Sequence, residues 1–332
     1  MAWAGRPEGL ERTIVEAYGW EYHAVPAYPF QRSESCGLVR AGLRNIGGVA
    51  RAARLLQQHA VDIVIGSGGY VAVPVYAAAR LHGVPYVMLE SNAVLGVANR
   101  WFADHARALF AAFPLRGRQP RTEVLVTGNP VRHEFRAPGR PPVPDDWRGR
   151  KLLVVVGGSQ GAEILNSFVA ENAARLAAAN PELRIVAIAG SRGAEALARQ
   201  LAGLPQVKVM PFTPELPALL SAAALVVARA GAMTLAELAY CGVPAVLVPF
   251  PQAAEDHQYA NATAFAADGR ALVVRHDPQD EAGTLAKIGE AVDAAMTNTM
   301  LIAMRSTARQ NAGSNPAMAI VDTLEKLIGQ PK

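Results

Sequence analysis

The hydrophobic residues of this chain gather in short apolar runs, and longer segments with one apolar face separate these runs. Runs without polar alternation are typical of parallel strands that are covered on both faces. The pattern predicts strands at residues 20–24, 61–65, 85–89, 108–111, 123–127, 152–156, 185–189, 207–210, 225–228, 245–248 and 271–274, with helices between them and a last helix at 316–328. Alternating strands and helices predict an α/β fold with doubly wound sheets.

A proline-rich stretch divides the chain. Residues 137–150 hold four prolines and two glycines, which cannot sustain a helix or a central strand. We therefore expect two Rossmann-like domains facing a cleft, the first at 1–136 and the second at 151–312, joined by a linker at 137–150. The last segment, 313–332, is expected to form a helix that packs back on the first domain.

The clearest candidate site lies between residues 225 and 262. An apolar strand ends in Arg229-Ala230-Gly231-Ala232, and a helix follows with Thr234 near its start and Glu237 in its first turns. Open parallel sheets bind ligands at the carboxyl ends of their strands, and a helix N-terminus there offers free N–H groups to a phosphate. The carboxylate of Glu237 could then accept hydrogen bonds from a ribose diol.

Other polar or glycine-rich loops also follow predicted strands. Gly157-Gly158-Ser159-Gln160-Gly161-Ala162 joins a strand to a helix; its glycines allow close approach of a ligand, and Ser159 supplies a hydroxyl. Gly66-Ser67-Gly68-Gly69-Tyr70 is a weaker example of this pattern. Asn92 follows another strand, and the guanidinium of Arg132 suits a diphosphate. Each feature has a structural alternative, a tight turn or a surface residue without a ligand.

A basic amphipathic helix is predicted at residues 37–59. Its apolar face is expected to hold Val39, Leu43, Ile46, Val49, Ala53 and Leu56, with Arg40, Arg44, Arg51 and Arg54 largely off that face. One interpretation is a solvated basic face over a packed apolar face. The other is a surface that faces a membrane.

Composition and charge narrow the class of protein. Of 332 residues, 51% are hydrophobic and 18% charged, which excludes a disordered chain. The net charge of +4 is uneven, with 18 Lys and Arg against 12 Asp and Glu in residues 1–150 and 14 against 16 in residues 151–332. A basic half fits an anionic membrane or substrate, whereas no nucleic-acid motif is found and no nucleic-acid partner is predicted. Cys36 and Cys241 are too few for a disulfide framework and indicate a reducing cytoplasm.

No cofactor is predicted. No spacing of Cys, His, Asp and Glu suggests a metal site, and most of the seven histidines are expected at the surface or in loops. No nucleophile elbow indicates a hydrolase. No apolar run reaches the roughly 18 residues typical of a transmembrane helix, and no signal peptide is recognised. A diphosphate would be held by helix dipoles, backbone N–H groups and arginine, without an obligatory metal ion.

Six motifs occur in an order that closely resembles glycosyltransferase family 28, in particular its bacterial N-acetylglucosaminyltransferases. They lie at residues 66–70, 90–92, 128–132, 157–162, 229–234 and 256–262. The resemblance covers nearly the whole chain and implies a GT-B type fold. It implies inverting transfer of N-acetylglucosamine (GlcNAc) from UDP-GlcNAc to the C4 hydroxyl of N-acetylmuramic acid in lipid I, undecaprenyl-diphospho-MurNAc-pentapeptide, which forms lipid II for peptidoglycan. It also implies peripheral attachment to the cytoplasmic face of the cell membrane, with other cell-wall synthesis proteins as possible partners.

By motif position, the resemblance assigns donor binding to Asn92, Arg132, Ser159, Thr213, Ala232, Met233, Thr234, Glu237 and Gln258. Supporting loop positions are Gly68, Gly69, Gly157, Gly158 and Gln160. Ser159 and residues 232–234 would face the diphosphate, and Thr213 would hold uracil through its backbone.

The remaining assignments concern the sugars and the first domain. Glu237 would take the ribose hydroxyls, and Gln258 would contact the GlcNAc hydroxyls. Asn92 and Arg132 would reach in from the first domain.

One element of the family has no counterpart in the sequence. The family begins with a strand, a loop of the Gly-Gly-Thr-Gly-Gly-His kind and a helix, whereas residues 1–11 resemble the segment that comes next. The absent unit supplies the acceptor-side diphosphate loop and the histidine proposed as general base, a role worth about 10²- to 10⁴-fold in rate. The catalytic residue is therefore unknown, and the first domain is expected to be truncated at its N-terminus.

Two explanations follow from this departure. We favour a start assigned too far downstream; the alternative is a natural truncation, a catalytically impaired scaffold that binds UDP-sugars. Another UDP-sugar glycosyltransferase or an epimerase of the same fold is a further alternative function.

Overall fold

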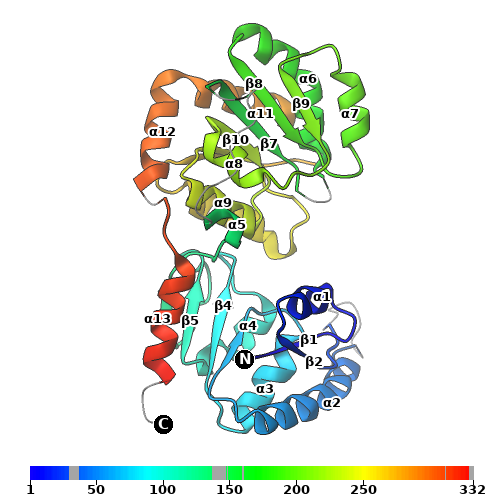
Figure 1. The fold of residues 1–332 in the computed structure, drawn as a ribbon, viewed down its shortest axis with the longest axis vertical. Coiled ribbons are helices and arrows are strands. Elements are labelled where there is room, and N and C mark those ends of the chain that lie inside the picture. The colour runs from blue at the N-terminus through cyan, green and yellow to red at the C-terminus, as the bar shows by residue number, and fades with distance from the viewer. Residues whose placement is uncertain (30–36, 137–146, 148, 159–160, 311, 329–332) are drawn as a thin grey trace. The chain divides into compact units, whose positions relative to one another are not determined.

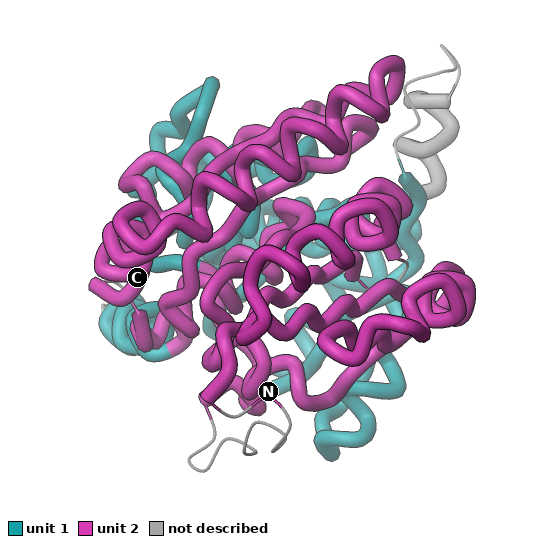
Figure 2. Tube along the Cα trace, turned by 90° about the horizontal axis from the view of Figure 1, so that it is seen from above, with its two compact units in different colours: residues 1–128, 318–332 teal, residues 129–317 magenta. Residues whose placement is uncertain are grey.

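The computed structural model describes residues 1–29, 37–136, 147, 149–158, 161–310 and 312–328. The chain divides into two compact units, residues 1–128 with 318–332 and residues 129–317 (Figure 2). Each unit has parallel sheets with helices packed against them, which confirms the predicted α/β class.

The first unit holds two parallel sheets. One pairs β1 (Ala2–Gly5) with β2 (Glu21–Ala24), and the other has the order β3 (Val64–Gly66), β4 (Tyr86–Glu90), β5 (Ala108–Ala111), β6 (Val124–Val126). Its helices are α1 (Leu10–Ala17), α2 (Gly37–Gln58), α3 (Ala72–Leu81), α4 (Val97–Phe102), the short 3-10 helix η1 (Ala103–His105) and most of α13 (Pro316–Ile328) (Figure 1). The strands are short and the helical connections between them are longer, as parallel pairing requires.

Alternate residues of β4 point to opposite faces of its sheet, and each face has its own apolar cluster. Met88 packs with Tyr76 of α3 and Leu55 of α2 on one face. On the other face Val87 packs with Ile320 and Leu324, so the C-terminal helix α13 belongs to the core of the first unit.

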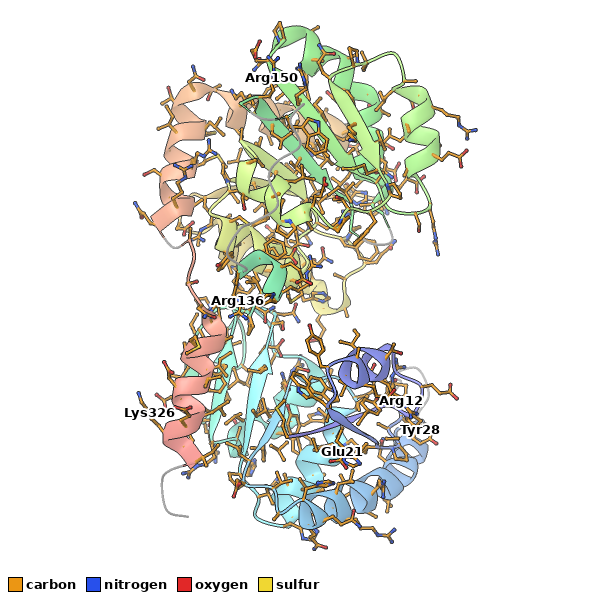
Figure 3. The ribbon with its side chains drawn as sticks, viewed as in Figure 1. Arg12, Glu21, Tyr28, Arg136, Arg150 and Lys326 are labelled. Carbon is orange, nitrogen blue, oxygen red and sulfur yellow. The ribbon has the colours of Figure 1, made fainter. Side chains whose placement is uncertain are left out.

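The predicted basic helix forms as α2, but its expected apolar face is wrong at Ile46. That side chain is 60% exposed, whereas Asn45, next to it, is buried. The amide of Asn45 accepts a hydrogen bond from the backbone N–H of Tyr28 at 3.0 Å and donates to its carbonyl at 3.2 Å, so the polar side chain is satisfied inside (Tyr28 is labelled in Figure 3). Gly48 approaches the Pro26 carbonyl so closely that a Cβ would lie 2.1 Å from its oxygen. These contacts turn Ile46 towards solvent; the side chains of Val39 and Leu43 lie outside the described residues.

The second unit has one six-stranded parallel sheet. Its order is β12 (Ala271–Val273), β11 (Ala245–Leu247), β10 (Leu225–Ala228), β7 (Lys151–Val156), β8 (Leu183–Ile188), β9 (Val207–Met210). Its helices are α5 (His133–Arg136), α6 (Glu163–Ala179), α7 (Ala194–Gln200), α8 (Leu216–Ala222), α9 (Ala232–Cys241), the 3-10 turn η3 (Ala254–Asp256), α10 (His257–Ala266), α11 (Glu281–Met296) and α12 (Asn298–Gln310). The chain runs from β7 outward to β9 and then returns to the other side of β7 at β10. The order of strands therefore reverses between β7 and β10, where open sheets of this kind bind ligands.

The boundary between the units differs from the expected one. The first domain was expected to end at residue 136, but the division falls between Gly128 and Asn129. The short helix α5 and Arg132 therefore belong to the second unit, because they pack on α9.

Candidate functional site

Two helices begin at the point where the strand order of the second unit reverses. Helix α6 follows β7, and helix α9 follows β10, with Ala162 and Gly231 as their N-cap residues. Neither N-cap makes a side-chain hydrogen bond to its helix. Within the described residues, no side chain at these N-cap positions binds the first N–H groups, and each helix presents the positive end of its dipole there.

The loop between β7 and α6 packs closely against β8. Gly161 has a left-handed φ of +80°, and a Cβ there would lie 2.5 Å from the carbonyl oxygen of Ala189. Gly158 is also left-handed, at φ +79°, but a Cβ would meet no atom within 4 Å. Ser159, predicted to bind the donor, and Gln160, predicted as a supporting loop position, lie outside the described residues. Gly161 therefore allows the loop before α6 to pack against the residue that follows β8.

Glu237 lies on α9 and is buried, with 6% of its surface exposed. Arg132 donates from Nε to Glu237 Oε1 at 3.1 Å and lies 3.0 Å from the same oxygen through Nη2. Burial raises the pKa of the Glu237 carboxyl, and the Arg132 guanidinium opposes that rise. Within the described part of the chain, Oε2 accepts no hydrogen bond and remains for a ligand. Arg132 is thus a second-unit residue that fixes the carboxylate, and its prediction as a first-domain residue is wrong.

The loop between β10 and α9 is held by Arg229, a half-buried residue that the sequence analysis did not count among the ligand-binding residues. Arg229 Nη1 donates to the carbonyls of Val248 and Pro249, both at 3.1 Å, and lies 3.3 Å from Nδ1 of His276. Burial lowers the pKa of Arg229 to about 10, so it stays charged at neutral pH. Burial and the neighbouring Arg229 also lower the pKa of His276. Arg229 therefore ties the loop after β10 to the loop after β11.

Gln258 and Thr213 are partly engaged in holding their own loops. Gln258, on α10, accepts a hydrogen bond from the backbone N–H of Phe250 at 3.0 Å through its Oε1, which leaves its amide nitrogen as a donor. Thr213 follows β9, is buried, and accepts a hydrogen bond from the N–H of Glu215 at 3.1 Å. Glu255 and Asp256, just before α10, have left-handed φ values of 54° and 52°. Non-glycine residues rarely adopt this conformation, which marks the loop as a constrained one.

Three predicted ligand-binding residues at the start of α9 differ in their exposure to solvent. Ala232 and Thr234 are half-buried, and Met233 is 43% exposed. Asn129 donates its amide to the Met233 sulfur at 3.2 Å, so the loop before α5 touches the start of α9. The exposed methionine and the unoccupied N–H groups of the helix therefore lie on one accessible turn.

In the first unit, the loops after β3 and β4 meet at a buried carboxylate. Glu90 accepts hydrogen bonds from the backbone N–H of Asn92 at 3.1 Å and of Gly96 at 2.9 Å, and from Asn99 Nδ2 at 2.9 Å. A Cβ on Gly68, where φ is +82°, would lie 3.1 Å from the Asn99 amide. Gly69 follows with φ +74°.

Glu90 and Asn99 are therefore positioning residues that the sequence interpretation missed. Glu90 could have been found from the sequence, because it is a charged residue at the end of an apolar strand. For Asn99 no comparable sequence signal existed. The predicted residues that the structure describes are divided between the two units, and most of them belong to the second unit.

This fold and these loops define a class of protein. The chain has two Rossmann-like units. In the second unit, two helix N-termini without side-chain caps and a buried carboxylate lie where the order of the strands reverses. This arrangement is typical of proteins that bind nucleotides or nucleotide sugars. The chain matches the models of the glycosyltransferase family 28 N-terminal domain over residues 1–111 and C-terminal domain over residues 152–320. The chain belongs to glycosyltransferase family 28.

Curated relatives and a solved structure agree with this assignment. A UDP-N-acetylglucosamine–N-acetylmuramyl-(pentapeptide) pyrophosphoryl-undecaprenol N-acetylglucosamine transferase of Parasynechococcus marenigrum is 39% identical, over 84% of this chain and 76% of that protein. A protein of the same name from Stutzerimonas stutzeri is 35% identical, over 96% of this chain and 88% of that protein. The crystal structure of MurG from Acinetobacter baumannii matches with a TM-score of 0.75 at 30% identity, covering 98% and 90% of the two chains. These similarities confirm the predicted GT-B architecture and transferase class.

No helix in the described part of the chain is both long enough and apolar enough to span a bilayer.

Proposed function

We propose that this chain transfers GlcNAc from UDP-GlcNAc to the C4 hydroxyl of N-acetylmuramic acid in lipid I, with inversion at the anomeric carbon, and so forms lipid II in peptidoglycan synthesis. The observation that carries the proposal is the similarity to the two named transferases over 84% and 96% of the chain. The arrangement of the second unit supports it, because the groups that a UDP-sugar needs converge at one edge of the sheet.

The donor diphosphate is assigned to the starts of α6 and α9. Ala232, Met233 and Thr234 form the first turn of α9, and Ser159 precedes α6 in the sequence. As the bond between the sugar and UDP breaks, negative charge grows on the diphosphate. The helix N-termini and the Arg132 guanidinium are preorganised positive groups that stabilise this charge. These groups supply the electrostatic role that a metal ion has in other transferases, so we propose catalysis without an obligatory metal ion.

The ribose is assigned to Glu237 and the uracil to the backbone at Thr213. Arg132 uses only Oε1 of Glu237, so Oε2 can accept hydrogen bonds from the ribose diol. The GlcNAc hydroxyls are assigned to the Gln258 amide nitrogen. Asn92, fixed by Glu90 in the first unit, is proposed to contact the donor as well.

The membrane is assigned to α2. Its exposed surface includes Ile46, Arg51 and Arg54, an apolar side chain beside two cations. An apolar side chain inserts among lipid tails while arginines attract anionic headgroups, which favours peripheral binding. We propose that the protein works at the cytoplasmic face of the cell membrane, where lipid I and other cell-wall synthesis proteins would be its partners.

A transfer assay with two donors tests this function. The protein is incubated with UDP-GlcNAc or UDP-glucose and a soluble lipid I analogue, and UDP release and the disaccharide product are measured. We expect a β-linked GlcNAc product and a clear preference for UDP-GlcNAc. Binding of UDP-GlcNAc without transfer would favour the scaffold function, and formation of a 2-epimer without acceptor would favour an epimerase; either result contradicts the proposal.

A further inference from the structure

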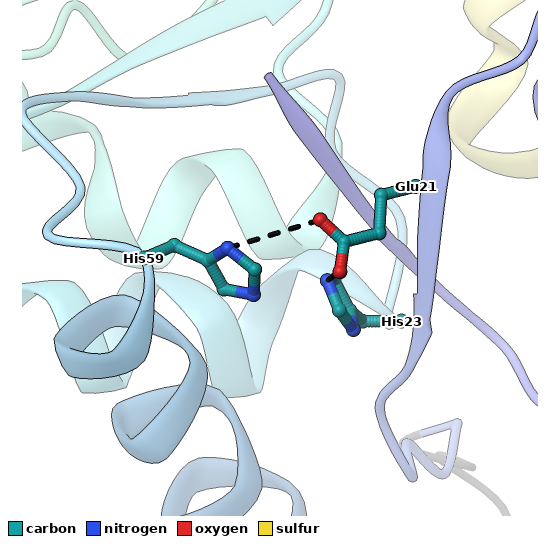
Figure 4. Close-up of side chains that lie close together, drawn as sticks. All are labelled: Glu21, His23 and His59. Carbon is teal, nitrogen blue, oxygen red and sulfur yellow. Dashed lines mark ion pairs between the residues drawn. The ribbon is translucent and has the colours of Figure 1, made fainter.

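Three side chains outside the nucleotide-binding loops converge in the first unit. Glu21 and His23 are two residues apart on β2, so both project from the same side of the strand (Figure 4). His59 directly follows the last turn of α2 and points its ring at them. Nε2 of His23 lies 3.3 Å from Oε1 of Glu21, and Nδ1 of His59 lies 3.8 Å from Oε2.

The two imidazoles are close neighbours, and that of His23 is the better shielded from water. Their ring centroids are 4.7 Å apart. The side chain of His23 is 16% exposed and that of His59 is 30% exposed, while Glu21 is 58% exposed. Nε2 of His23 is buried and makes no hydrogen bond within the described part of the chain. A buried ring nitrogen that makes no hydrogen bond carries a desolvation cost that a bound ligand would offset.

One ligand atom from each residue lies within 4.8 Å of the others. In a tetrahedral zinc site the ligand atoms are about 3.4 Å apart, because zinc–ligand bonds are about 2.1 Å long. The Glu21–His23 pair has nearly this spacing, at 3.3 Å, and the His59–Glu21 pair is within about half an ångström of it, at 3.8 Å. Two imidazoles and one carboxylate are donors that zinc prefers, whereas magnesium and calcium prefer oxygen ligands alone.

We propose that Glu21, His23 and His59 bind a divalent transition-metal ion of the zinc type, with the exposed side of the site open for a water ligand. The site is separate from the transferase chemistry. Glu21 opens β2 and His59 precedes β3, so the site lies at the amino ends of these strands, whereas the loops at Gly68 and Asn92 follow the carboxyl ends of β3 and β4. The bound ion would stabilise the first unit, because it links β2 of the two-stranded sheet to the residue that follows α2.

The chain gives a matched set of variants for testing the site. His23→Ala and His59→Ala each remove one ligand, and Glu21→Gln keeps the shape of the side chain but removes its charge. His105→Ala is the control, since His105 is an exposed histidine of the same unit that lies outside the cluster. All proteins are prepared without an affinity tag and stripped with chelator, and circular dichroism verifies that each variant is folded.

Zinc binding is measured by titration calorimetry. We expect one Zn²⁺ per chain with micromolar or tighter affinity, and no heat with Mg²⁺. Each cluster variant should bind at least about 100-fold more weakly, since loss of a direct ligand exceeds the 10- to 100-fold typical of an outer partner. His105→Ala should bind as the unchanged protein does. Wild-type protein that binds no zinc, or cluster variants that bind as tightly as His105→Ala, would overturn the proposal.

Two further readouts report on ligand type and role. Co²⁺ bound by nitrogen and oxygen ligands in a low-coordinate site should give visible absorption bands, which the His23→Ala variant should lack. At a zinc concentration about 100 times the dissociation constant, the melting temperature should rise by roughly 5 °C. Visible bands that persist in His23→Ala, or a melting temperature that zinc does not raise, would contradict a structural site at these three residues.

Discussion

The pair of Glu237 and Arg132 combines a buried acid with a half-exposed base. The Glu237 side chain is 8% exposed and that of Arg132 is 49% exposed. A buried carboxylate needs charged or hydrogen-bonding partners, and Arg132 supplies them to one oxygen only. The pair therefore holds the carboxylate in place and leaves Oε2 for a ligand.

Replacing Glu237 with Ala should weaken donor binding. Loss of charge-assisted hydrogen bonds to the ribose costs roughly 1.5–3 kcal/mol, which corresponds to a KM for UDP-GlcNAc about 10 to 150 times higher. Steady-state kinetics measure this change. Glu195→Ala is the control, because that side chain is 87% exposed on α7. An unchanged KM in the Glu237 variant would show that the ribose is held elsewhere.

Replacing Arg132 with Ala should make stability depend more strongly on pH. Without the guanidinium the folded-state pKa of Glu237 rises further, since burial is then unopposed. The folded state then binds the proton more tightly than the unfolded chain, so stability is retained below the ordinary Glu value of 4.5 and lost as pH rises through the folded pKa.

Urea unfolding between about pH 4 and pH 7 measures this effect. The deficit against the unchanged protein should be about 1–3 kcal/mol at neutral pH and shrink at acid pH. Arg150→Ala, which loses an exposed ion pair with Glu182 (Arg150 is labelled in Figure 3), should show no such trend. A deficit that grows towards acid pH would be inconsistent with the assigned pair.

At the scale of elements, the glycine loop between β7 and α6 brings the helix N-terminus against the sheet. Gly158 and Gly161 have nearly the same backbone conformation but different surroundings. Comparing the two positions separates conformational strain from steric exclusion.

Alanine at these positions should cost different amounts of stability. Gly158→Ala should cost about 1–2 kcal/mol for the left-handed conformation alone. Gly161→Ala should cost about 2–5 kcal/mol, because its Cβ also meets the Ala189 carbonyl oxygen and forces a backbone shift. Denaturant midpoints and the affinity for UDP-GlcNAc measure both effects. Equal costs at the two positions would mean that the loop is not packed as described.

The exposed face of α2 makes a further prediction. Replacing Ile46 with Glu should weaken binding to anionic vesicles at least about fivefold, since one charge near a membrane surface is worth about 1 kcal/mol. Cosedimentation with phosphatidylglycerol vesicles at low salt measures it. Ile302→Glu on α12 is the control, because Ile302 is 70% exposed in the other unit. Equal binding by the two variants would remove α2 from the membrane-binding surface.

The sequence predicted elements better than contacts. The predicted strands at 207–210 and 225–228 formed with those bounds. The second is an uninterrupted apolar run whose four residues are all buried, as a central parallel strand requires. The face of α2 was misplaced because Asn45 is buried through hydrogen bonds to Tyr28, a partner 17 residues away that periodicity does not reveal. The Arg132–Glu237 pair and the Glu21–His23–His59 cluster were missed for the same reason. Their members are distant in sequence, and only the fold brings them together.

In the whole molecule, the two units are assigned different roles in binding. The second unit carries the strand-order reversal, the helix N-termini and Glu237, and it is assigned to the donor. The first unit carries α2, the Glu90 network that fixes Asn92, and the cluster at Glu21. Membership of glycosyltransferase family 28 rests on matches in both units, over residues 1–111 and 152–320.

The transfer of labelled GlcNAc to lipid I is the direct test of the proposed transferase activity. The protein is incubated with radiolabelled UDP-GlcNAc and a lipid I analogue, and the label in the lipid product is counted beside that of the Glu237→Ala variant. We expect one labelled GlcNAc per acceptor in a β-linkage to the muramoyl C4 oxygen, at a rate that falls in the variant when donor is limiting. Protein that binds UDP-GlcNAc but leaves the acceptor unlabelled would contradict it.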